Sequence, residues 1–311
     1  AIYLVRKAYA QGINYFDTAR DYENSEEIIG EALKYVRENC FIGTKTHART
    51  KEGIEEDLFK SLAKLQTKYI DLYQLHTVNT LEEFESMNCK ALDFLLRQKD
   101  RGVINNLGIT SHRPDEAYKI IKIWGGYFDS VMVPLNYIEQ EPFHNGLHNL
   151  CQKKDIALIA MKVVADGRLS NPDNAIKWVF NRPYVEIGET QTRRGNVGAV
   201  VGTTSIDHMA KNVESAEKTS INPAEIETLE EDKERLNGNL CRRCDKCVEV
   251  CPNDIKPTWI IQYRHIFNQY GWDLMNMKKE RRIAKGLECE DCGKCNEVCP
   301  LDIDLGAKVR E

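Results

Sequence analysis

Apolar and polar positions follow one another along this chain in two recurring patterns. Short apolar runs bounded by glycine or polar residues are typical of buried strands, and segments with an apolar residue every three or four positions are typical of helices. The pattern predicts seven strands, at Ile13–Phe16, Phe41–Thr44, Tyr69–Leu75, Asn106–Thr110, Ser130–Val133, Ile156–Ala160 and Gly198–Val201. It predicts eight helices, at Ala1–Ala10, Ser25–Asn39, Lys51–Leu65, Thr80–Lys99, Pro114–Trp124, His144–Lys153, Pro172–Asn181 and Ile206–Glu217.

This regular alternation predicts an α/β fold, a (β/α)8 TIM barrel whose first strand is missing from the chain. An open doubly wound sheet is the second possibility, and it is disfavoured because no G-x-G-x-x-G sequence follows an early strand. The chain begins at Ala1, without a methionine and already in a helix pattern. We therefore expect a further element ahead of Ala1, and these first residues do not indicate whether an export signal precedes them.

The composition narrows the class of protein. Hydrophobic residues make up 42% of the 311 residues and charged residues 29%, and no apolar run is long enough to cross a bilayer. The net charge is −5, and the basic residues are interspersed with acidic ones, so the chain has no nucleic-acid-binding stripe. These features predict a cytoplasmic protein without a membrane segment.

Cysteine is distributed unevenly, because eight of the eleven cysteines follow residue 240. This change in composition predicts a domain boundary. We expect the barrel to cover residues 1–220, a closing helix and linker to cover 221–239, and a separate domain to cover 240–311. The acidic run within the linker is expected to be a solvated face.

Polar residues stand at the ends of three successive predicted strands, namely Asp17, Lys45 and His76, and Tyr22 follows Asp17 on a loop. In a barrel of this kind the carboxyl ends of the strands carry the chemistry. Taken singly, each of the four is ordinary loop or cap chemistry. Their order along the chain, each at or just after a strand, makes them a candidate site.

Three blocks carry a resemblance to a known family. GINYFDTARDY, FIGTK and DLYQLH resemble the signature blocks of the aldo-keto reductases, over about residues 1–220. NLGITSH, IALIAMK and VVGTTSIDHMAKN are further similar blocks. The resemblance places the family's catalytic tetrad on Asp17, Tyr22, Lys45 and His76.

Carbonyl reduction explains why these four residue types are wanted together. A hydride goes to carbon and a proton to oxygen, and a Tyr hydroxyl with a pKa of ~10 is a weak acid unless its surroundings favour the phenolate. Lys45 beside Tyr22 is expected to do so, with Asp17 holding the ammonium through an ion pair. His76 is expected to orient the carbonyl oxygen.

The resemblance also implies a nicotinamide cofactor, NADP or NAD. The residues expected to contact it are Ser111, His112, Met161, Lys162, Gly202, Thr203, Thr204, His208 and Asn212. The last five include a loop whose amides could hold a phosphate at a helix N-terminus. The chain departs from the family where His112 stands for Asn, Met132 for Gln and His208 for an Arg that binds the 2′-phosphate.

The connection between the last two predicted strands, Tyr184–Asn196, is long and polar. The simplest interpretation is an exposed loop, and the alternative is a loop that contacts the substrate or a partner.

The strongest motif lies near the end of the chain. The run C-x2-C-x2-C-x3-C-P occurs twice, formed by Cys241, Cys244, Cys247 and Cys251, and by Cys289, Cys292, Cys295 and Cys299. This is the bacterial ferredoxin pattern and predicts two [4Fe–4S] clusters, with the fourth cysteine of each run serving the other cluster. Two four-cysteine runs that each end in Pro disfavour zinc and disulfides. Helix patterns follow Pro257 and Trp272, as in a helical dicluster module, and Cys40, Cys89 and Cys151 are expected to be thiols.

Two function classes follow from these motifs. The first is an NAD(P)H-dependent aldo-keto reductase acting on a small carbonyl substrate, with an iron–sulfur module that serves a redox protein partner. The second is an electron-transfer or regulatory subunit whose barrel binds nucleotide or a partner with little turnover. The tetrad favours the enzyme.

Overall fold

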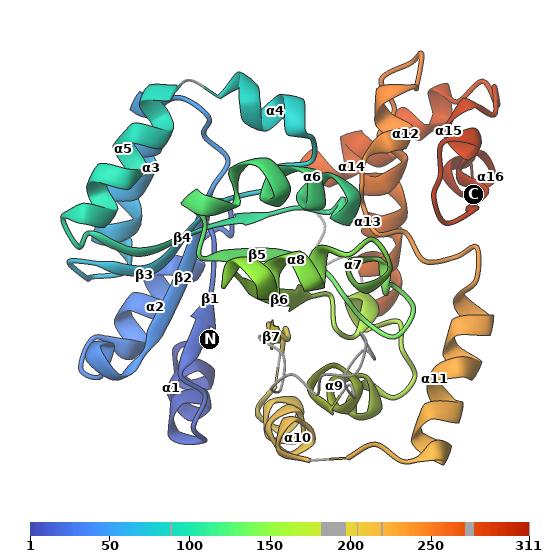
Figure 1. The fold of residues 1–311 in the computed structure, drawn as a ribbon. Coiled ribbons are helices and arrows are strands. Elements are labelled where there is room, and N and C mark those ends of the chain that lie inside the picture. Colours follow the sequence, from blue (N-terminus) through green and yellow to red (C-terminus); the bar gives the residue numbers. More distant parts are fainter. Residues whose placement is uncertain (88, 182–196, 204, 219, 271–276, 311) are drawn as a thin grey trace. The chain divides into compact units, whose positions relative to one another are not determined.

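The structure is a computed structural model that describes residues 1–311 apart from 88, 182–196, 204, 219, 271–276 and 311. It divides into two compact units, Ala1–Glu230 and Glu231–Glu311 (Figure 1). Within the described residues no helix is both long and apolar enough to span a bilayer.

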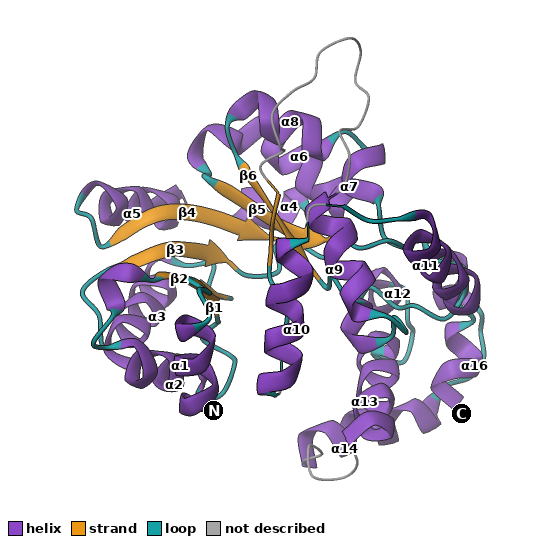
Figure 2. Ribbon diagram, turned by 90° about the horizontal axis from the view of Figure 1, so that it is seen from below, coloured by secondary structure: helices purple, strands orange, loops and turns teal. Residues whose placement is uncertain are grey.

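The first unit is built on a sheet of parallel strands that pair in chain order (Figure 2). The strands are β1 (Tyr15–Asp17), β2 (Phe41–Thr46), β3 (Ile70–Leu75), β4 (Ile104–Thr110), β5 (Ser130–Pro134), β6 (Ala157–Met161) and β7 (Val197–Ala199). All seven predicted strands are therefore confirmed. The sheet curls into an open half-barrel, and the pairings among the described residues run from β1 to β7 without closing the ring.

Helices alternate with these strands. They are α1 (Ile2–Ala10), α2 (Ser25–Leu33), α3 (Lys51–Lys64), α4 (Leu81–Ser86), α5 (Cys89–Asp100), α6 (Pro114–Trp124), α7 (Glu141–His144), α8 (Leu147–Lys154), α9 (Pro172–Asn181) and α10 (Ile206–Glu217). Helix α11 (Pro223–Leu236) contains the point at which the two units divide. One expected helix, Thr80–Lys99, is two helices in the structure, because the backbone of Met87 is extended (φ −64°, ψ 126°) and ends α4.

The sheet is largely buried on both faces because helices cover one side of it and side chains fill the other. Every residue of β3 is buried, and so is every residue of β5. The register of the sheet decides which polar residues meet. Asp17 of β1 pairs with Gly43 of β2, and this places its carboxylate within reach of Lys45 on the same strand. A Cβ at Gly43 would lie 3.4 Å from Asp17 Oδ1 and 3.2 Å from the Tyr15 ring, so this glycine leaves room for the carboxylate.

The second unit is helical and has an internal repeat. Its helices after α11 are α12 (Lys246–Glu249), α13 (Pro257–Tyr270), α14 (Met277–Ala284), α15 (Lys294–Glu297) and α16 (Leu305–Arg310). The backbone has positive φ at three pairs of equivalent positions in the two cysteine runs, Arg243 and Asp291, Asp245 and Gly293, and Asp254 and Asp302. The two runs therefore fold in the same way. Helices were expected after Pro257 and after Trp272, and α13 and α14 lie there; Trp272 itself lies outside the described residues.

The core of this unit is small and includes the cysteines. Cys241 and Cys247 pack with Ile261, Ile303 and Leu305 in one buried cluster. A second cluster, formed by Ile255, Ile260 and Val309, packs against Cys251 and Cys289. The apolar interior is thus arranged around the cysteine side chains.

Candidate functional site

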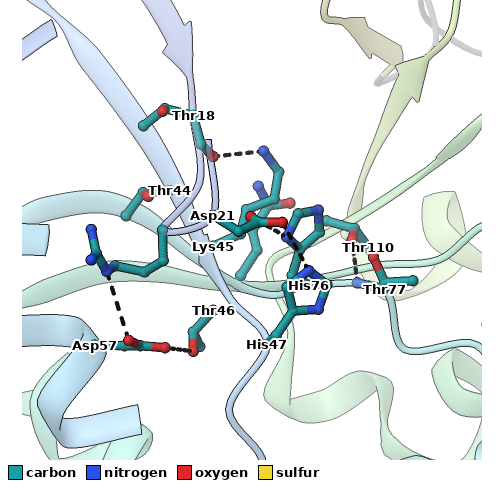
Figure 3. Close-up of polar contacts among 12 residues, drawn as sticks. Thr18, Asp21, Thr44, Lys45, Thr46, His47, Asp57, His76, Thr77 and Thr110 are labelled. Carbon is teal, nitrogen blue, oxygen red and sulfur yellow. Dashed lines mark hydrogen bonds and ion pairs between the residues drawn. The ribbon is translucent and has the colours of Figure 1, made fainter. Parts of the chain in front are cut away.

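Lys45 is the centre of the site at the carboxyl ends of the strands. It lies in β2, is 1% exposed, and its Nζ is 2.5 Å from Asp17 Oδ2. The same ammonium donates a hydrogen bond of 2.7 Å to the carbonyl oxygen of Thr18 (Figure 3). A buried ammonium needs such partners, because an unpaired charge in the interior is strongly destabilising.

Tyr22 and His76 complete the predicted group. The Lys45 ammonium lies 5.2 Å from the centroid of the Tyr22 ring. The Tyr22 and His76 rings meet edge to face, with centroids 5.8 Å apart. Tyr22 is 44% exposed, whereas His76 is buried. The four residues predicted from separate strand ends therefore lie in one place, with the phenol on the solvent side.

The Asp17 carboxylate has neutral donors on its other oxygen. The Tyr15 hydroxyl and Gln74 Nε2 each lie 3.5 Å from Asp17 Oδ1. Burial, together with the Asp17 charge, raises the pKa of the Tyr15 hydroxyl well above its ordinary value. Tyr15 therefore stays protonated beside Asp17 and helps to hold the carboxylate that pairs with Lys45.

The strand that carries Lys45 is fixed by ion pairs on its flanks. Thr44 Oγ1 donates to Glu26 Oε1 at 2.8 Å, and Glu26 forms an ion pair with Arg20. Thr46 Oγ1 donates to Asp57 Oδ2 at 2.5 Å, and Arg20 Nε lies 3.7 Å from the other oxygen of Asp57 (Figure 3). The threonines on either side of the lysine are thus tied to one guanidinium through two carboxylates.

His76 has two further neighbours that the sequence reasoning missed. Its Nδ1 lies 3.3 Å from Asp21 Oδ1, and the other Asp21 oxygen lies 3.2 Å from His47 Nε2. The two imidazole rings stack with centroids 4.2 Å apart and planes at 21° (Figure 3). The signal for both residues was positional, since Asp21 directly precedes Tyr22 and His47 follows Lys45 by two residues.

The pKa values of His76 and Asp21 both lie below their ordinary values, for different reasons. Burial lowers the pKa of His76, with His47 and Lys45 adding to the effect and Asp21 opposing it. Burial opposes ionisation of Asp21, but the contacts with His47 and His76 outweigh it and hold the pKa of that carboxyl well below its ordinary value. Asp21 is therefore ionised at neutral pH.

Asp21, His47 and His76 are also the residue types that bind transition metals, and their ligand atoms lie within 4.8 Å of one another. The lone pair of an imidazole nitrogen lies in the plane of its ring. Because the two rings are stacked at 21°, their lone pairs do not converge on a common point. This arrangement suits a carboxylate between two imidazoles better than a preformed metal site.

Ser111 and His112 follow the end of β4, where the nicotinamide was expected. Ser111 is buried, and its Oγ donates to the carbonyl oxygen of Arg113 at 3.2 Å and lies 3.4 Å from Asn79 Oδ1. The His112 backbone N–H donates to the same Asn79 oxygen at 3.0 Å. An amide side chain therefore does lie beside Ser111, and it comes from the loop after β3 rather than from the next residue.

The methionines have different surroundings. Met132 is 2% exposed and packs in the interior of the sheet with Leu72 and Ile159. Met161, at the end of β6, is partly buried and packs against the same cluster. Lys162 has positive φ (57°), and its Nζ lies 3.6 Å from Asp166 Oδ2. Met132 is thus a packing residue, and contacts of Met161 and Lys162 with a cofactor stay a prediction.

Helix α10 begins next to the expected phosphate loop. Ser205 caps the helix by accepting a hydrogen bond of 3.1 Å from the His208 backbone N–H, and Thr203 Oγ1 donates to the Ser205 carbonyl oxygen at 3.0 Å. Gly202 is exposed, and a Cβ there would meet nothing within 4 Å. The loop is open to solvent at the positive end of a helix dipole, which is a favourable place for a phosphate.

Of the other residues predicted in this region, two are described and the rest are not. Asn212 is half-buried on α10, and His208 is exposed on it. Thr204 and the polar loop 184–196 lie outside the described residues, so their expected roles stay predictions.

The eight cysteines of the second unit line two separate cavities. One cavity is lined by Cys241, Cys244, Cys247 and Cys299, and the other by Cys251, Cys289, Cys292 and Cys295. Each cavity therefore takes three cysteines from one run and the fourth from the other. None of the eleven cysteines, all of which lie among the described residues, forms a disulfide.

The donor set of each cavity fits an iron–sulfur cluster. Four cysteine side chains line each cavity, and the matching positive φ values bring the two runs into equivalent backbone shapes. Burial raises the pKa of Cys247 and of Cys295, so both are neutral thiols until a metal displaces the proton. By contrast, burial raises the pKa of the isolated Cys151 to about 12, which makes this thiol inert.

The surroundings of the two cavities differ in charge. Arg242, Arg243 and Lys246 line the first cavity. Glu290 and Asp291 line the second. The two cavities are thus equivalent in backbone but not in electrostatics.

Comparison with known proteins places both units in families. A profile of the Aldo/keto reductase family matches residues 1–174, and a profile of the 4Fe-4S dicluster domain matches residues 233–300. The chain is 32% identical over 184 residues to the "Uncharacterized oxidoreductase YqkF" of Bacillus subtilis, covering 55% of this chain and 58% of that protein. It is 34% identical over 155 residues to the "Aldo-keto reductase YhdN" of Bacillus subtilis, covering 45% of each. The chain thus spans less than two thirds of the length of these curated relatives.

Solved structures show the same fold. The aldo-keto reductase AKR11C1 from Bacillus halodurans (holo form) matches with a TM-score of 0.59 at 25% identity, over 74% of this chain and 85% of that one. An aldo/keto reductase from Klebsiella pneumoniae, solved in complex with NADP and acetate, matches with a TM-score of 0.59 at 19% identity, over 74% and 83% of the two chains.

Proposed function

The chain belongs to the aldo/keto reductase family, and on that premise we propose that its first unit reduces a small aldehyde or ketone to the alcohol with NADPH or NADH. The observation that carries the proposal is the Lys45 ammonium, which is paired with Asp17 at 2.5 Å and lies 5.2 Å from the Tyr22 ring centroid. A barrel that only binds a partner has no need of a buried ammonium against an exposed phenol.

Tyr22 is the proton donor in this proposal. Its hydroxyl gives a proton to the carbonyl oxygen, and the Lys45 ammonium stabilises the phenolate that is left. Asp17 keeps the ammonium in place through the ion pair. His76, whose ring meets the Tyr22 ring edge to face, orients the oxygen. For alcohol oxidation the same residues act in reverse, with the Tyr22 phenolate as the base.

The nicotinamide cofactor, when bound, supplies the hydride to the carbonyl carbon. Ser111 and Asn79 are the polar pair that would hold its carboxamide, because their side chains meet after β4. The open start of α10, with Gly202 and Thr203, would hold a phosphate. His208, exposed on the same helix, would face the 2′-phosphate of NADP.

The second unit would hold two [4Fe–4S] clusters in its two four-cysteine cavities. Such clusters exchange single electrons, whereas a nicotinamide gives up two electrons as a hydride. We therefore assign the clusters to a separate redox protein partner and not to the carbonyl reaction.

The test is aldehyde-dependent oxidation of NADPH and NADH by wild type and by Tyr22→Phe. The variant should lose about a hundredfold or more of the turnover, since a positioned proton donor contributes that much, and should bind the dinucleotide normally. Tyr35→Phe, at an exposed position in the turn after α2, is the matched control. Wild-type turnover in Tyr22→Phe would sink the assignment of the tetrad. Dinucleotide binding without turnover of any carbonyl in a broad panel would favour the electron-transfer or regulatory subunit instead.

A further inference from the structure

His76 sits between groups of opposite charge. Asp21, on the loop after β1, approaches its Nδ1 at 3.3 Å. His47, just after β2, stacks on the ring with centroids 4.2 Å apart, and the Lys45 ammonium lies 5.2 Å from the centroid of the Tyr22 ring, which meets His76 edge to face. Among the described residues that act on the charge of the imidazole, the carboxylate is that of Asp21, at the Nδ1 end.

The position of the ring is set by the backbone around it. The His76 N–H donates to the Thr46 carbonyl oxygen at 2.8 Å, and the His76 carbonyl oxygen accepts from Arg49 Nη2 at 2.7 Å. From the next strand, Thr110 Oγ1 accepts from the Thr77 N–H at 2.8 Å and brings no charge. The charged and titratable groups that face the ring are thus those of the β1 loop and of β2 with its following residues.

The Asp21 charge decides which ring nitrogen carries the proton. A carboxylate beside an unprotonated nitrogen would set a negative charge against a lone pair, which is repulsive, whereas an N–H there is attracted. The Nδ1–H direction is not aligned well enough on Oδ1 for a hydrogen bond, so in the neutral ring the attraction is that of the carboxylate charge for the N–H dipole. His47 Nε2, at 3.2 Å, holds the other Asp21 oxygen and so keeps the carboxylate turned toward both rings.

We propose that Asp21 is a positioning residue that keeps the proton of neutral His76 on Nδ1, so that Nε2 is the nitrogen that takes up and releases the second proton. The neutral ring then presents an acceptor at Nε2, which matches the hydroxyl of an alcohol. The imidazolium presents a donor there, which matches the oxygen of a carbonyl. The consequence for catalysis rests on the proposed function, whereas the tautomer itself does not.

The two directions of the reaction should therefore depend on pH in opposite ways. In carbonyl reduction the His76 Nε2–H donates a hydrogen bond and keeps its proton, while Tyr22 transfers a proton to the oxygen. This donor is present below the pKa of His76 and is lost as pH rises through it, so reduction should decline there. Alcohol oxidation should rise over the same range. Because burial, His47 and Lys45 lower that pKa, the decline should begin on the acid side of an ordinary histidine.

The tautomer can be observed directly, without any turnover. Protein labelled with ¹⁵N-histidine is titrated while long-range ¹H–¹⁵N spectra are recorded, and the His76 signals are assigned by their loss in His76→Gln. Wild type should show neutral His76 protonated on Nδ1. Asp21→Asn, which keeps the shape of the side chain but removes its charge, should shift the neutral ring toward the Nε2–H form. A wild-type His76 protonated on Nε2 would overturn the proposal.

The pH–rate profile tests the catalytic consequence, with matched controls. Asp21→Asn should move the decline of carbonyl reduction to lower pH and lower the rate several-fold above it. His47→Gln, which can still donate to Asp21 but cannot become charged, should move it to higher pH. Glu23→Gln, which removes an exposed charge from the same loop, should leave the profile in place. A uniform loss of rate at every pH in Asp21→Asn would show a structural role only and would overturn the proposal.

The two readouts separate this inference from the proposed function. The Nδ1–H tautomer in a protein that reduces no carbonyl would leave the positioning role standing and remove the reductase. Carbonyl reduction by a protein whose His76 carries the Nε2 proton would do the reverse.

Discussion

The two units build their sites in opposite ways. In the first unit, Asp17 and Lys45 are 28 residues apart in the chain and meet because neighbouring parallel strands end at the same edge of the sheet. In the second unit, each cavity takes three cysteines from one short run and a fourth from the other run. The first kind of site depends on the register and packing of a whole sheet, whereas the second depends on local spacing and one crossing of the chain.

The difference extends to what holds each site together. The charges of the barrel site already have protein partners, since Lys45 contacts both Asp17 and the Thr18 carbonyl. The second unit has a small apolar core that includes Cys241 and Cys247 themselves. Below about 80 residues such a core supplies little stability, and a structural metal commonly makes up the difference. We therefore expect the barrel to keep its site without metal and the second unit to need it.

The largest effect is expected at the centre of the barrel site. Lys45→Met removes the ammonium beside Tyr22, so carbonyl reduction should fall by about a hundredfold or more. It also leaves Asp17 without its partner, which should cost about 3 kcal/mol of the free energy of unfolding. Turnover and urea denaturation measure the two effects. The control is Lys60→Met, which removes an exposed ion pair with Glu56 on α3 and should change neither turnover nor stability. Normal turnover in Lys45→Met would show that the barrel site does not need the buried ammonium.

Removal of iron separates the two units. Cluster-free protein should become sensitive to proteolysis within 231–311, because four thiols that share no metal do not link the two cysteine runs, while residues 1–230 stay protected. Reduction of a small carbonyl by NAD(P)H should survive. Limited proteolysis read by mass spectrometry, iron analysis and turnover assays check this. Loss of turnover with a folded barrel, or bleaching of the clusters by NAD(P)H alone in flavin-free protein, would show that the units are coupled.

Crossed ligation predicts damage at a distance. Cys251→Ser should expose Cys289, Cys292 and Cys295 to alkylation and leave the four cysteines of the other cavity, Cys299 among them, protected, because Cys251 lines the cavity of the second run. Cys299→Ser should do the reverse. The two variants are controls for each other, and peptide mapping after alkylation measures both. Alkylation confined to the mutated run would mean that each run binds its own cluster.

A smaller effect is expected at the start of α10. His208 is exposed, so His208→Arg adds a guanidinium at the surface of α10. A charge-assisted hydrogen bond from it to the 2′-phosphate should lower the Kd for NADP by about tenfold. NAD has no such phosphate and should change little. Titration calorimetry with both dinucleotides measures the difference, with His144→Arg on α7 as the control. Equal tightening of both would place the phosphate elsewhere.

The smallest effect concerns the difference between the two cavities. Positive charge beside a cluster favours its reduction, so the cavity lined by Arg242, Arg243 and Lys246 should hold the cluster that is reduced first. Arg243→Gln should lower that potential, and Glu290→Gln should raise the potential of the other cluster. A redox titration followed by electron paramagnetic resonance resolves the two. Coincident potentials that neither variant moves would mean that these charges are screened.

Much of this arrangement follows from short-range patterns. The seven strands were predicted because residues buried on both faces of a parallel sheet must be apolar. Asp17, Lys45 and His76 meet as expected because they stand at the ends of successive strands. The crossed grouping of the cysteines followed from their spacing.

Other features depend on contacts between segments that no local pattern reports. Asn79, rather than the residue after Ser111, brings an amide to that site, since the loop after β3 reaches the end of β4. Met132 packs in the sheet interior. The division of the units falls inside α11, where a closing helix and linker had been expected.

The sequence by itself determined the order of strands and helices, the residue types at the strand ends and the cysteine spacing, because periodicity and spacing are properties of neighbouring residues. Only the tertiary structure decided that Asp21 and His47 flank His76, since their contacts depend on the register of β1, β2 and β3 and on the direction in which each loop leaves its strand. A charge acts over a few ångströms in space, and distance along the chain does not measure that separation.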